Sequence, residues 1–241
     1  MTYLEFHLAF MMPPIVALAM VQRTPMGGIG TAGALKWIAV VCGIAFVYTT
    51  PWDNYLVYRG VWDYGPERVI GTIGYVPIEE YMFFILQPIL TGLWYCLVRG
   101  LGYFPAGSSH PGWFRSAYVG FWLVISIVGF VFLFDGNDST LYMGLILAWC
   151  GPVLAGMSFL CANRFWRRGG ELLMAIAVPT VYLWVADRMA IGWGIWDIAD
   201  QYSLPFEPFG LPIEEAVFFL VTNLLVVQGL IMFFPPDDQR L

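Results

Sequence analysis

The chain has 241 residues, a formal net charge of −6 at neutral pH, 59% hydrophobic residues and only 12% charged residues. Soluble domains carry roughly 25% charged residues, so this composition excludes a large soluble domain and predicts an integral membrane protein. The cysteines stand in apolar stretches without paired spacing, which favours buried thiols over a disulfide framework or a zinc site. They are Cys42, Cys96, Cys150 and Cys161.

Seven apolar stretches are candidates for membrane spans, each of which needs about 20 residues to cross a bilayer. They are Leu4–Val21, Leu35–Thr50, Ile78–Val98, Ala117–Phe134, Leu141–Cys161, Leu172–Val185 and Ile213–Phe233. The second and the sixth are short, and the first contains Pro13-Pro14, which predicts a kink. The predicted fold class is an all-α polytopic membrane bundle of seven transmembrane helices.

The basic residues between these spans predict the orientation. One side of the membrane carries Arg23, Lys36, Arg99, Arg115, Arg164, Arg167, Arg168 and Arg240, and the other carries only Arg59, Arg68 and Arg188. Loops rich in Lys and Arg stay in the cytoplasm. We therefore expect a multi-pass protein of the cell membrane with its N-terminus outside and its C-terminus cytoplasmic.

A short acidic motif occurs twice, each time at the start of an apolar run. Pro77-Ile78-Glu79-Glu80 is followed by Phe83-Phe84, and Pro212-Ile213-Glu214-Glu215 is followed by Phe218-Phe219. Carboxyl groups at the mouth of a membrane helix are costly to desolvate, so they indicate a functional site. Glutamates in the first turn also suit the helix dipole and the free N–H groups there.

The flanking sequence repeats in register with the motif. Asp53 and Trp62 have counterparts 134 residues later in Asp187 and Trp196, and the two motif copies lie 135 residues apart. The repeat predicts two three-helix units, residues 1–100 and 138–241. A connecting fourth helix within 101–137 gives both units the same orientation, as parallel repeats about an axis along the membrane normal.

This pattern suits acid chemistry on a hydrocarbon, because burial and like-charge crowding help a carboxyl to hold a proton and aromatic faces stabilise a carbocation. The candidate catalytic residues are Glu79, Glu80, Glu214 and Glu215, supported by Asp53 and Asp187. The candidate substrate-binding rings are Phe83, Phe84, Phe218, Phe219, Trp62 and Trp196. The plainer alternative is that the glutamates only cap helices, the Phe pairs pack in the core and the Trp residues anchor at the interface.

Other motifs support no cofactor, metal or nucleic-acid site. Gly28, Gly30 and Gly33 match a dinucleotide-binding pattern, but no strand precedes them. His7 could join a proton relay, although a hydrogen-bonded bundle histidine is the simpler interpretation, and His110 has no evident metal partner. A magnesium-binding acidic motif of the prenyl-diphosphate type is absent from the sequence.

Several motifs resemble those of the membrane lycopene cyclases of the non-flavin type. This family occurs as two small subunits in some bacteria and as one fused chain in archaea and fungi. The residues that carry the resemblance are Pro51-Trp52-Asp53-Asn54-Tyr55, Gly60-Val61-Trp62, Pro66-Glu67-Arg68 and the stretch from Pro77 to Phe84. Asp187-Arg188 and the stretch from Pro212 to Phe219 resemble the second subunit.

The resemblance implies a redox-neutral, acid-catalysed cyclisation of the ψ end groups of lycopene. Protonation at C2 gives a cation at C1, the C5=C6 double bond closes the ring, and loss of a proton from C6 gives a β-ionone ring. Two rounds give γ-carotene and then β-carotene, so the enzyme is of the intramolecular lyase or isomerase type. Its expected partners are lycopene, other carotenoids with ψ end groups and membrane lipid; the oligomeric state is not readable from the sequence.

Three alternatives share features with this interpretation. A seven-helix retinal protein is rejected, because its Schiff-base lysine belongs in the last span and the only lysine here is Lys36. A proton-coupled transporter would share the repeat and the acids, but these acids gather near one face. A hydratase acting on the same carotenoid end group would share the protonation step and let water capture the cation.

Overall fold

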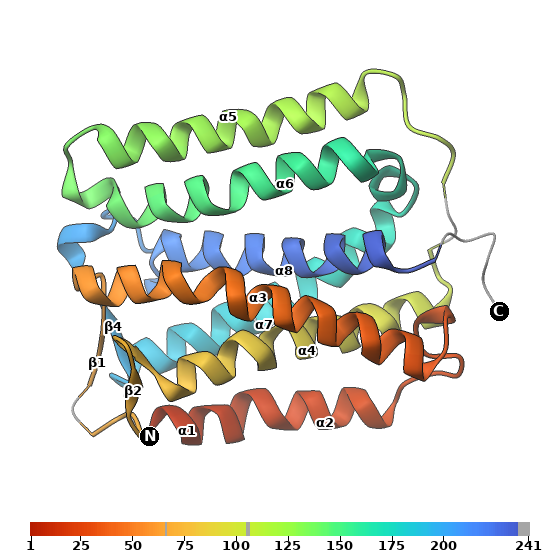
Figure 1. The fold of residues 1–241 in the computed structure, drawn as a ribbon. Helices are drawn as coiled ribbons and strands as arrows, with labels where there is room; N and C mark the ends of the chain where they lie inside the picture. Colours follow the sequence, from red (N-terminus) through yellow and green to blue (C-terminus); the bar gives the residue numbers. More distant parts are fainter. Residues whose placement is uncertain (66, 105–106, 236–241) are drawn as a thin grey trace.

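A computed structural model describes residues 1–65, 67–104 and 107–235 of the chain. Pro66 of the resemblance motif and Arg240 of the charge count lie outside the described residues. Within the described part, seven helices are long and apolar enough to cross a membrane, and they run side by side along one axis (Figure 1). The predicted fold class is confirmed: the protein is an all-α, multi-pass membrane bundle.

The helices follow the predicted order. The first span combines α1 (Tyr3–Phe6), a π-helical turn (His7–Met11) and α2 (Met12–Met20), and it is followed by α3 (Thr31–Arg59), α4 (Ile78–Leu101), α5 (Phe114–Phe134), α6 (Leu141–Arg167), α7 (Gly169–Gly192) and α8 (Ile213–Phe233). Short 3₁₀ turns lie at Met26–Gly28, Asp138–Thr140, Asp200–Tyr202 and Pro208–Gly210. The π-helical turn stands directly before Pro13, whose missing N–H interrupts the regular ladder.

The second and sixth spans are longer than predicted, so the expectation of short helices was wrong. Helix α3 has 29 residues and continues through Pro51 and Asp53, and α7 has 24 residues and continues through Asp187. Both aspartates are buried, so they face the interior of the bundle. Sequence reasoning had ended both helices early because it assigned the acidic residues to loops.

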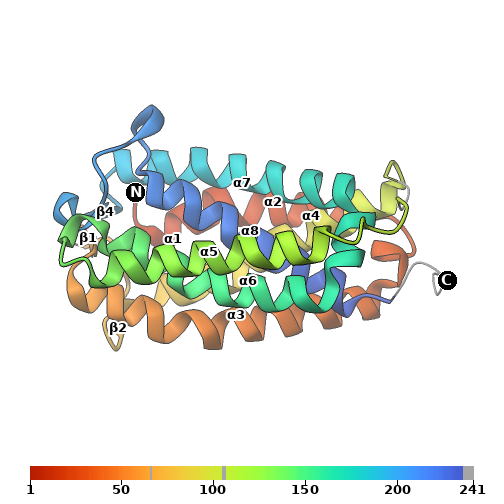
Figure 2. The same cartoon turned by 90° about the horizontal axis from the view of Figure 1, so that it is seen from above.

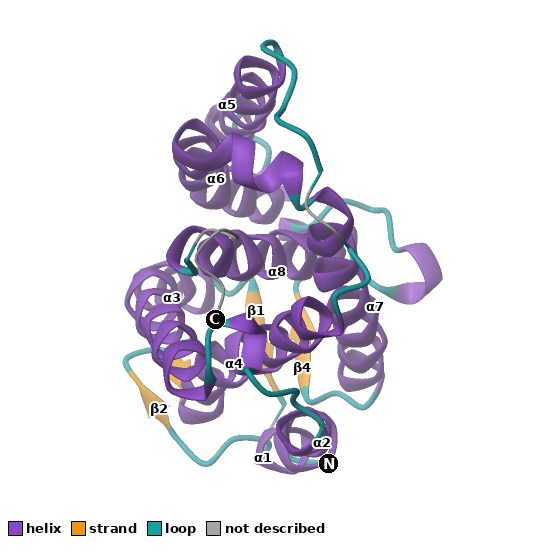
Figure 3. Cartoon of the chain, turned by 90° about the vertical axis from the view of Figure 1, so that its right-hand side faces the viewer, coloured by secondary structure: helices purple, strands orange, loops and turns teal. Residues whose placement is uncertain are grey.

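Helices α4 and α8 occupy the centre of the bundle (Figure 3), and each is more deeply buried than any other span. Helices α3 and α7 lie on opposite sides of this pair, while α5 lies at the periphery and packs on α6. Glycine permits that close packing, since a Cβ at Gly129 would meet the backbone nitrogen of Ala148 at 2.4 Å. The two helices that carry the acidic motif are thus the two central ones.

Four short strands lie at the end of the bundle that holds the N-terminus (Figure 2). They are β1 (Trp62–Tyr64), β2 (Thr72–Ile73), β3 (Val76–Pro77) and β4 (Trp196–Ile198), with β2 paired to β3. Strands β1 and β4 come from the two predicted repeats and pair antiparallel, with Asp63 opposite Asp197. Each Trp of the pair lies opposite the third residue of the other strand, so the two segments exchange the same contacts.

The division into residues 1–100, 101–137 and 138–241 stays a prediction, as does the orientation of the termini.

Candidate active site

The second glutamate of each motif copy lies inside the bundle and accepts a hydrogen bond from a tyrosine of the span that begins its repeat. The hydroxyl of Tyr3 donates to Glu80 Oε2 at 2.6 Å, and the hydroxyl of Tyr142 donates to Glu215 Oε1 at 2.5 Å. Tyr64 adds a second phenol to Glu80 at 3.3 Å. The two glutamates are 6% and 3% exposed, so these phenols replace the water that burial removes.

The first glutamate of each copy turns back to the loop before its helix. Glu79 Oε1 accepts the backbone N–H of Ile70 at 2.8 Å, and Glu214 Oε1 accepts that of Leu204 at the same distance. Each therefore closes a loop onto the helix start. His7 Nε2 donates to the carbonyl of Glu79 at 2.8 Å, which fits the interpretation of a hydrogen-bonded bundle histidine.

The helix starts differ slightly from the predicted arrangement. Pro77 and Pro212 occupy the N-cap positions with extended backbone angles, so Ile78 and Ile213 are the first helical residues. The glutamates still lie within the first turn, where anionic side chains are favoured.

The two aspartates differ in their hydrogen bonds, although they match in sequence. Asp187 Oδ1 accepts the indole N–H of Trp196 at 2.9 Å. Among the described residues, neither oxygen of Asp53 has a hydrogen-bond partner, and the indole N–H of its expected counterpart Trp62 has none either. Electrostatic interactions link Asp53 to Glu80 and Glu215, and Asp187 to Glu80, so the four carboxyl groups form one cluster.

Three of these carboxyls border one small cavity of about 30 Å³, which we call the carboxyl cavity. Its lining consists of Glu80, Asp187 and Glu215 with Tyr3, Trp62, Tyr64, Phe83, Trp196, Phe218 and Phe219. Rings from both repeats meet there: those of Phe83 and Phe219 lie 6.1 Å apart at 78°. The volume suits a small branched group among aromatic faces.

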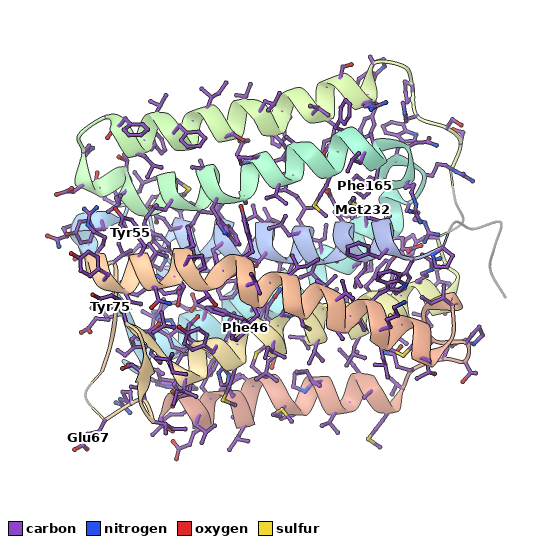
Figure 4. All side chains as sticks on the ribbon, in the orientation of Figure 1. Phe46, Tyr55, Glu67, Tyr75, Phe165 and Met232 are labelled. Carbon is purple, nitrogen blue, oxygen red and sulfur yellow. The ribbon has the colours of Figure 1, made fainter. Side chains whose placement is uncertain are left out.

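A second, apolar cavity of about 260 Å³ adjoins the first, and we call it the apolar groove. Phe83 and Phe218 line both cavities and form the wall between them. The groove follows α8 from Phe218 to Phe233, 15 residues or about 22 Å of helix. In Figure 4 its far end, marked by Met232, lies opposite the end of the bundle that holds Tyr75. Its shape suits a long, thin, apolar molecule.

Most of the predicted site residues meet at the carboxyl cavity, and three do not line it. Glu79 and Glu214 are occupied with loop backbone, and Phe84 lines only the apolar groove. Sequence reasoning missed Tyr3, Tyr64 and Tyr142. A signal for two of them exists: Tyr3 and Tyr142 lie 139 residues apart, as do Pro13 and Pro152.

Tyr64 is the site residue that lies outside the helices, on β1. Burial, together with the neighbouring carboxyl of Glu80, holds the pKa of Tyr64 well above its ordinary value. Its hydroxyl therefore remains a hydrogen-bond donor to Glu80 throughout the neutral range. The corresponding position in the other repeat is Ile198, which cannot donate, so the two halves of the site are chemically unequal.

A buried polar cluster lies deeper in the bundle. Asn223 Oδ1 accepts from Gln87 and Thr91 at 2.7 and 2.5 Å, and its amide donates to Thr180 at 3.0 Å. These contacts join α4, α7 and α8 beneath the site. Within the described residues, no group of three His, Cys, Asp or Glu side chains is arranged to hold a metal ion.

The chain is similar to proteins of known name over almost its full length. It is 42% identical to a lycopene beta-cyclase of Halobacterium salinarum, over 96% of this chain and 95% of the relative. Fungal bifunctional lycopene cyclase/phytoene synthases match over about the same part of the chain. Those of Phycomyces blakesleeanus and Gibberella fujikuroi are 37% and 36% identical, and the match covers 38% and 39% of their lengths. No family model and no solved structure matched the chain. By its identity to these relatives, the chain belongs to the lycopene cyclase family.

Proposed function

We propose that this protein is a lycopene β-cyclase that converts the ψ end groups of lycopene to β-ionone rings, giving γ-carotene and then β-carotene. The observation that carries the proposal is the carboxyl cavity, in which three buried carboxyls face a wall of aromatic rings. The adjoining apolar groove suits the polyene of a carotenoid. The names of the relatives agree with this substrate.

The reaction needs one proton delivered and one removed. A carboxyl acid protonates C2 of the end group, which leaves a cation at C1. The C5=C6 bond then attacks through C6, the C1–C6 bond forms, and the cation moves to C5. A carboxylate takes the proton from C6. Atoms and electrons balance within one molecule, so the enzyme class is an intramolecular lyase or isomerase.

The unequal hydrogen bonds suggest which carboxyl has which role. Hydrogen bonds from O–H donors stabilise a carboxylate over a carboxylic acid. Glu80 accepts two phenols and Glu215 accepts one. We therefore assign Glu80 as the base and Glu215 as the acid. Asp187 and Asp53, which are coupled to them electrostatically, return the proton from base to acid between turnovers.

The aromatic residues hold the cation between the two proton transfers. The rings of Phe83, Phe218 and Phe219 border the carboxyl cavity together with Trp62 and Trp196. An aromatic face attracts a cation by up to about 2 kcal/mol in a desolvated site. It offers no lone pair for a covalent bond, so the cation survives until the C6 proton leaves.

We further propose that the carboxyl cavity lies at the outer side of the membrane. The basis is the excess of basic residues in the loops at the opposite end of the bundle, including Arg23, Arg164 and Arg167. A reporter fused to the C-terminus should then remain in the cytoplasm.

Expression in cells that accumulate lycopene tests the function. We expect cyclic carotenes to form, and the Glu80→Gln/Glu215→Gln double variant to insert normally without forming them. A wild-type protein that is made and inserted while lycopene persists unchanged would refute the proposal. Turnover in deuterated water should place deuterium at C2 of each new ring.

A further inference from the structure

A third hollow lies on the lipid-facing side of the bundle, between α3 and α6. It is lined by Val40, Gly43, Ile44, Val47, Tyr48, Pro51, Trp52 and Trp149. We call it the lipid-side hollow. Three residues, Ile44, Tyr48 and Trp149, line both this hollow and the apolar groove. Only these side chains therefore separate the groove from the membrane here.

The partition is held by aromatic stacking and one hydrogen bond. The rings of Tyr48 and Trp149 stack with centroids 5.3 Å apart at 19°, and the Tyr48 hydroxyl donates to the carbonyl of Trp149 at 2.9 Å. Trp149 also stacks on Trp52 at 5.0 Å. The indole N–H of Trp149 has no hydrogen-bond partner among the described residues, so no polar contact fixes that ring.

The partition lies at the depth of the hydrocarbon core. Tyr48 stands 11 residues before the end of α3 at Arg59, which is about 16 Å of helix. Helices α3 and α6 make few direct contacts, because both pack mainly on other helices. A rotation of Tyr48 and Trp149 would open the groove directly to lipid.

We propose that Tyr48 and Trp149 form a lateral gate through which a linear polyene passes from the bilayer into the apolar groove. The proposal rests on the cyclase function, because a carotenoid substrate is dissolved in lipid. The three hollows form a continuous series: the lipid-side hollow, the groove, and the carboxyl cavity behind Phe83 and Phe218. An end group that follows this series arrives at the carboxyls with its chain behind it.

Gly43 allows the gate to be blocked from outside without disturbing the core. It lines the lipid-side hollow, and a Cβ built there meets nothing within 4 Å. Gly43→Ala, Gly43→Leu and Gly43→Phe therefore fill the hollow in steps. Gly120 on α5 is the matched control, since its Cβ also meets nothing within 4 Å and it lines none of the three hollows.

The test measures binding separately from ring closure. In a Glu80→Gln background, lycopene in detergent micelles is mixed with the protein, and energy transfer from tryptophan to the polyene reports association. We expect the association rate to fall in order of side-chain size, by at least tenfold for Gly43→Phe, with Gly120→Phe unchanged. Tyr48→Ala should speed association severalfold.

Equal association rates across the Gly43 series would overturn the gate, whether or not the wild type cyclises lycopene. Failure of the wild type to form cyclic carotenes would instead refute the proposed function. Because association is read in a background that lacks the proposed base, the two failures are distinguishable.

Discussion

The assignment of Glu80 as the base leads to a prediction about isotope exchange. Replacing Glu80 by Gln keeps an acceptor oxygen for the Tyr3 hydroxyl, now 2.6 Å away, and removes the ability to take a proton. A positioned acid or base contributes about 10²- to 10⁴-fold to a rate, or about 3 to 5.5 kcal/mol at 1.36 kcal/mol for each factor of ten. Ring formation by Glu80→Gln should fall by that amount.

The two glutamates should fail in different ways. With Glu80→Gln the acid remains, so the cation forms and collapses back by losing a proton. Lycopene recovered from deuterated water should then carry deuterium in its end groups. With Glu215→Gln the first proton transfer is lost, and recovered lycopene should stay unlabelled.

The bias between the glutamates should depend on the Tyr64 hydroxyl. One hydrogen bond to a charged group contributes roughly 1.5 kcal/mol or more, about a factor of ten. Mass spectrometry of recovered lycopene and quantification of cyclic products by chromatography provide the readouts. Label in lycopene from Glu215→Gln but not from Glu80→Gln would reverse the assignment. Equal labelling in both would refute the argument from hydrogen bonds.

Four further predictions concern other contacts. Glu79→Gln should retain most activity, since the amide oxygen can still accept the Ile70 N–H; a loss as large as that of Glu80→Gln would place Glu79 in the chemistry. Tyr142→Phe should lower ring formation by about tenfold, because Glu215 loses its only phenol, and normal insertion must be verified by a folded-state assay. Asn223→Ala should lower the free energy of unfolding by about 2 kcal/mol for three hydrogen bonds at about 0.6 kcal/mol each, measured by unfolding in mixed micelles; no change would show that the polar cluster is not stabilising. Because the pKa of Tyr64 is raised in the folded state, its stabilisation is present below its ordinary pKa of about 10 and is lost as the pH rises through the folded value. Unfolding measured at increasing alkaline pH should therefore fall less steeply in Tyr64→Phe than in the wild type.

The spans were predictable because hydrophobic length is a strong signal in a membrane protein. The last span, Ile213–Phe233, agrees with the structure at both ends. The ends of α3 and α7 were not predictable from hydropathy, since Asp53 and Asp187 look like loop residues until the helices around them are known. A buried acid inside a span is costly, and only the cluster of carboxyls and rings explains it.

The site could be predicted in part, because its residues repeat along the chain. The glutamates, aspartates and most of the rings were identified from spacing alone. The tyrosines were missed because a tyrosine near a span end is usual in an interfacial belt. Which glutamate of each pair faces the cavity also depends on loop geometry: Ile70 and Leu204 present their N–H groups to the first of each pair.

The position of the carboxyls at one end of the bundle has a consequence for the order of products. Lycopene has two identical ends, but the carboxyl cavity lies at only one end of the apolar groove. A molecule that has closed one ring holds its second ψ end at the far end of the groove, about 22 Å along α8. It must leave, turn end for end and bind again. The enzyme would therefore be distributive, and the ratio of one-ring to two-ring product would follow the competition between fresh lycopene and released γ-carotene in the surrounding lipid.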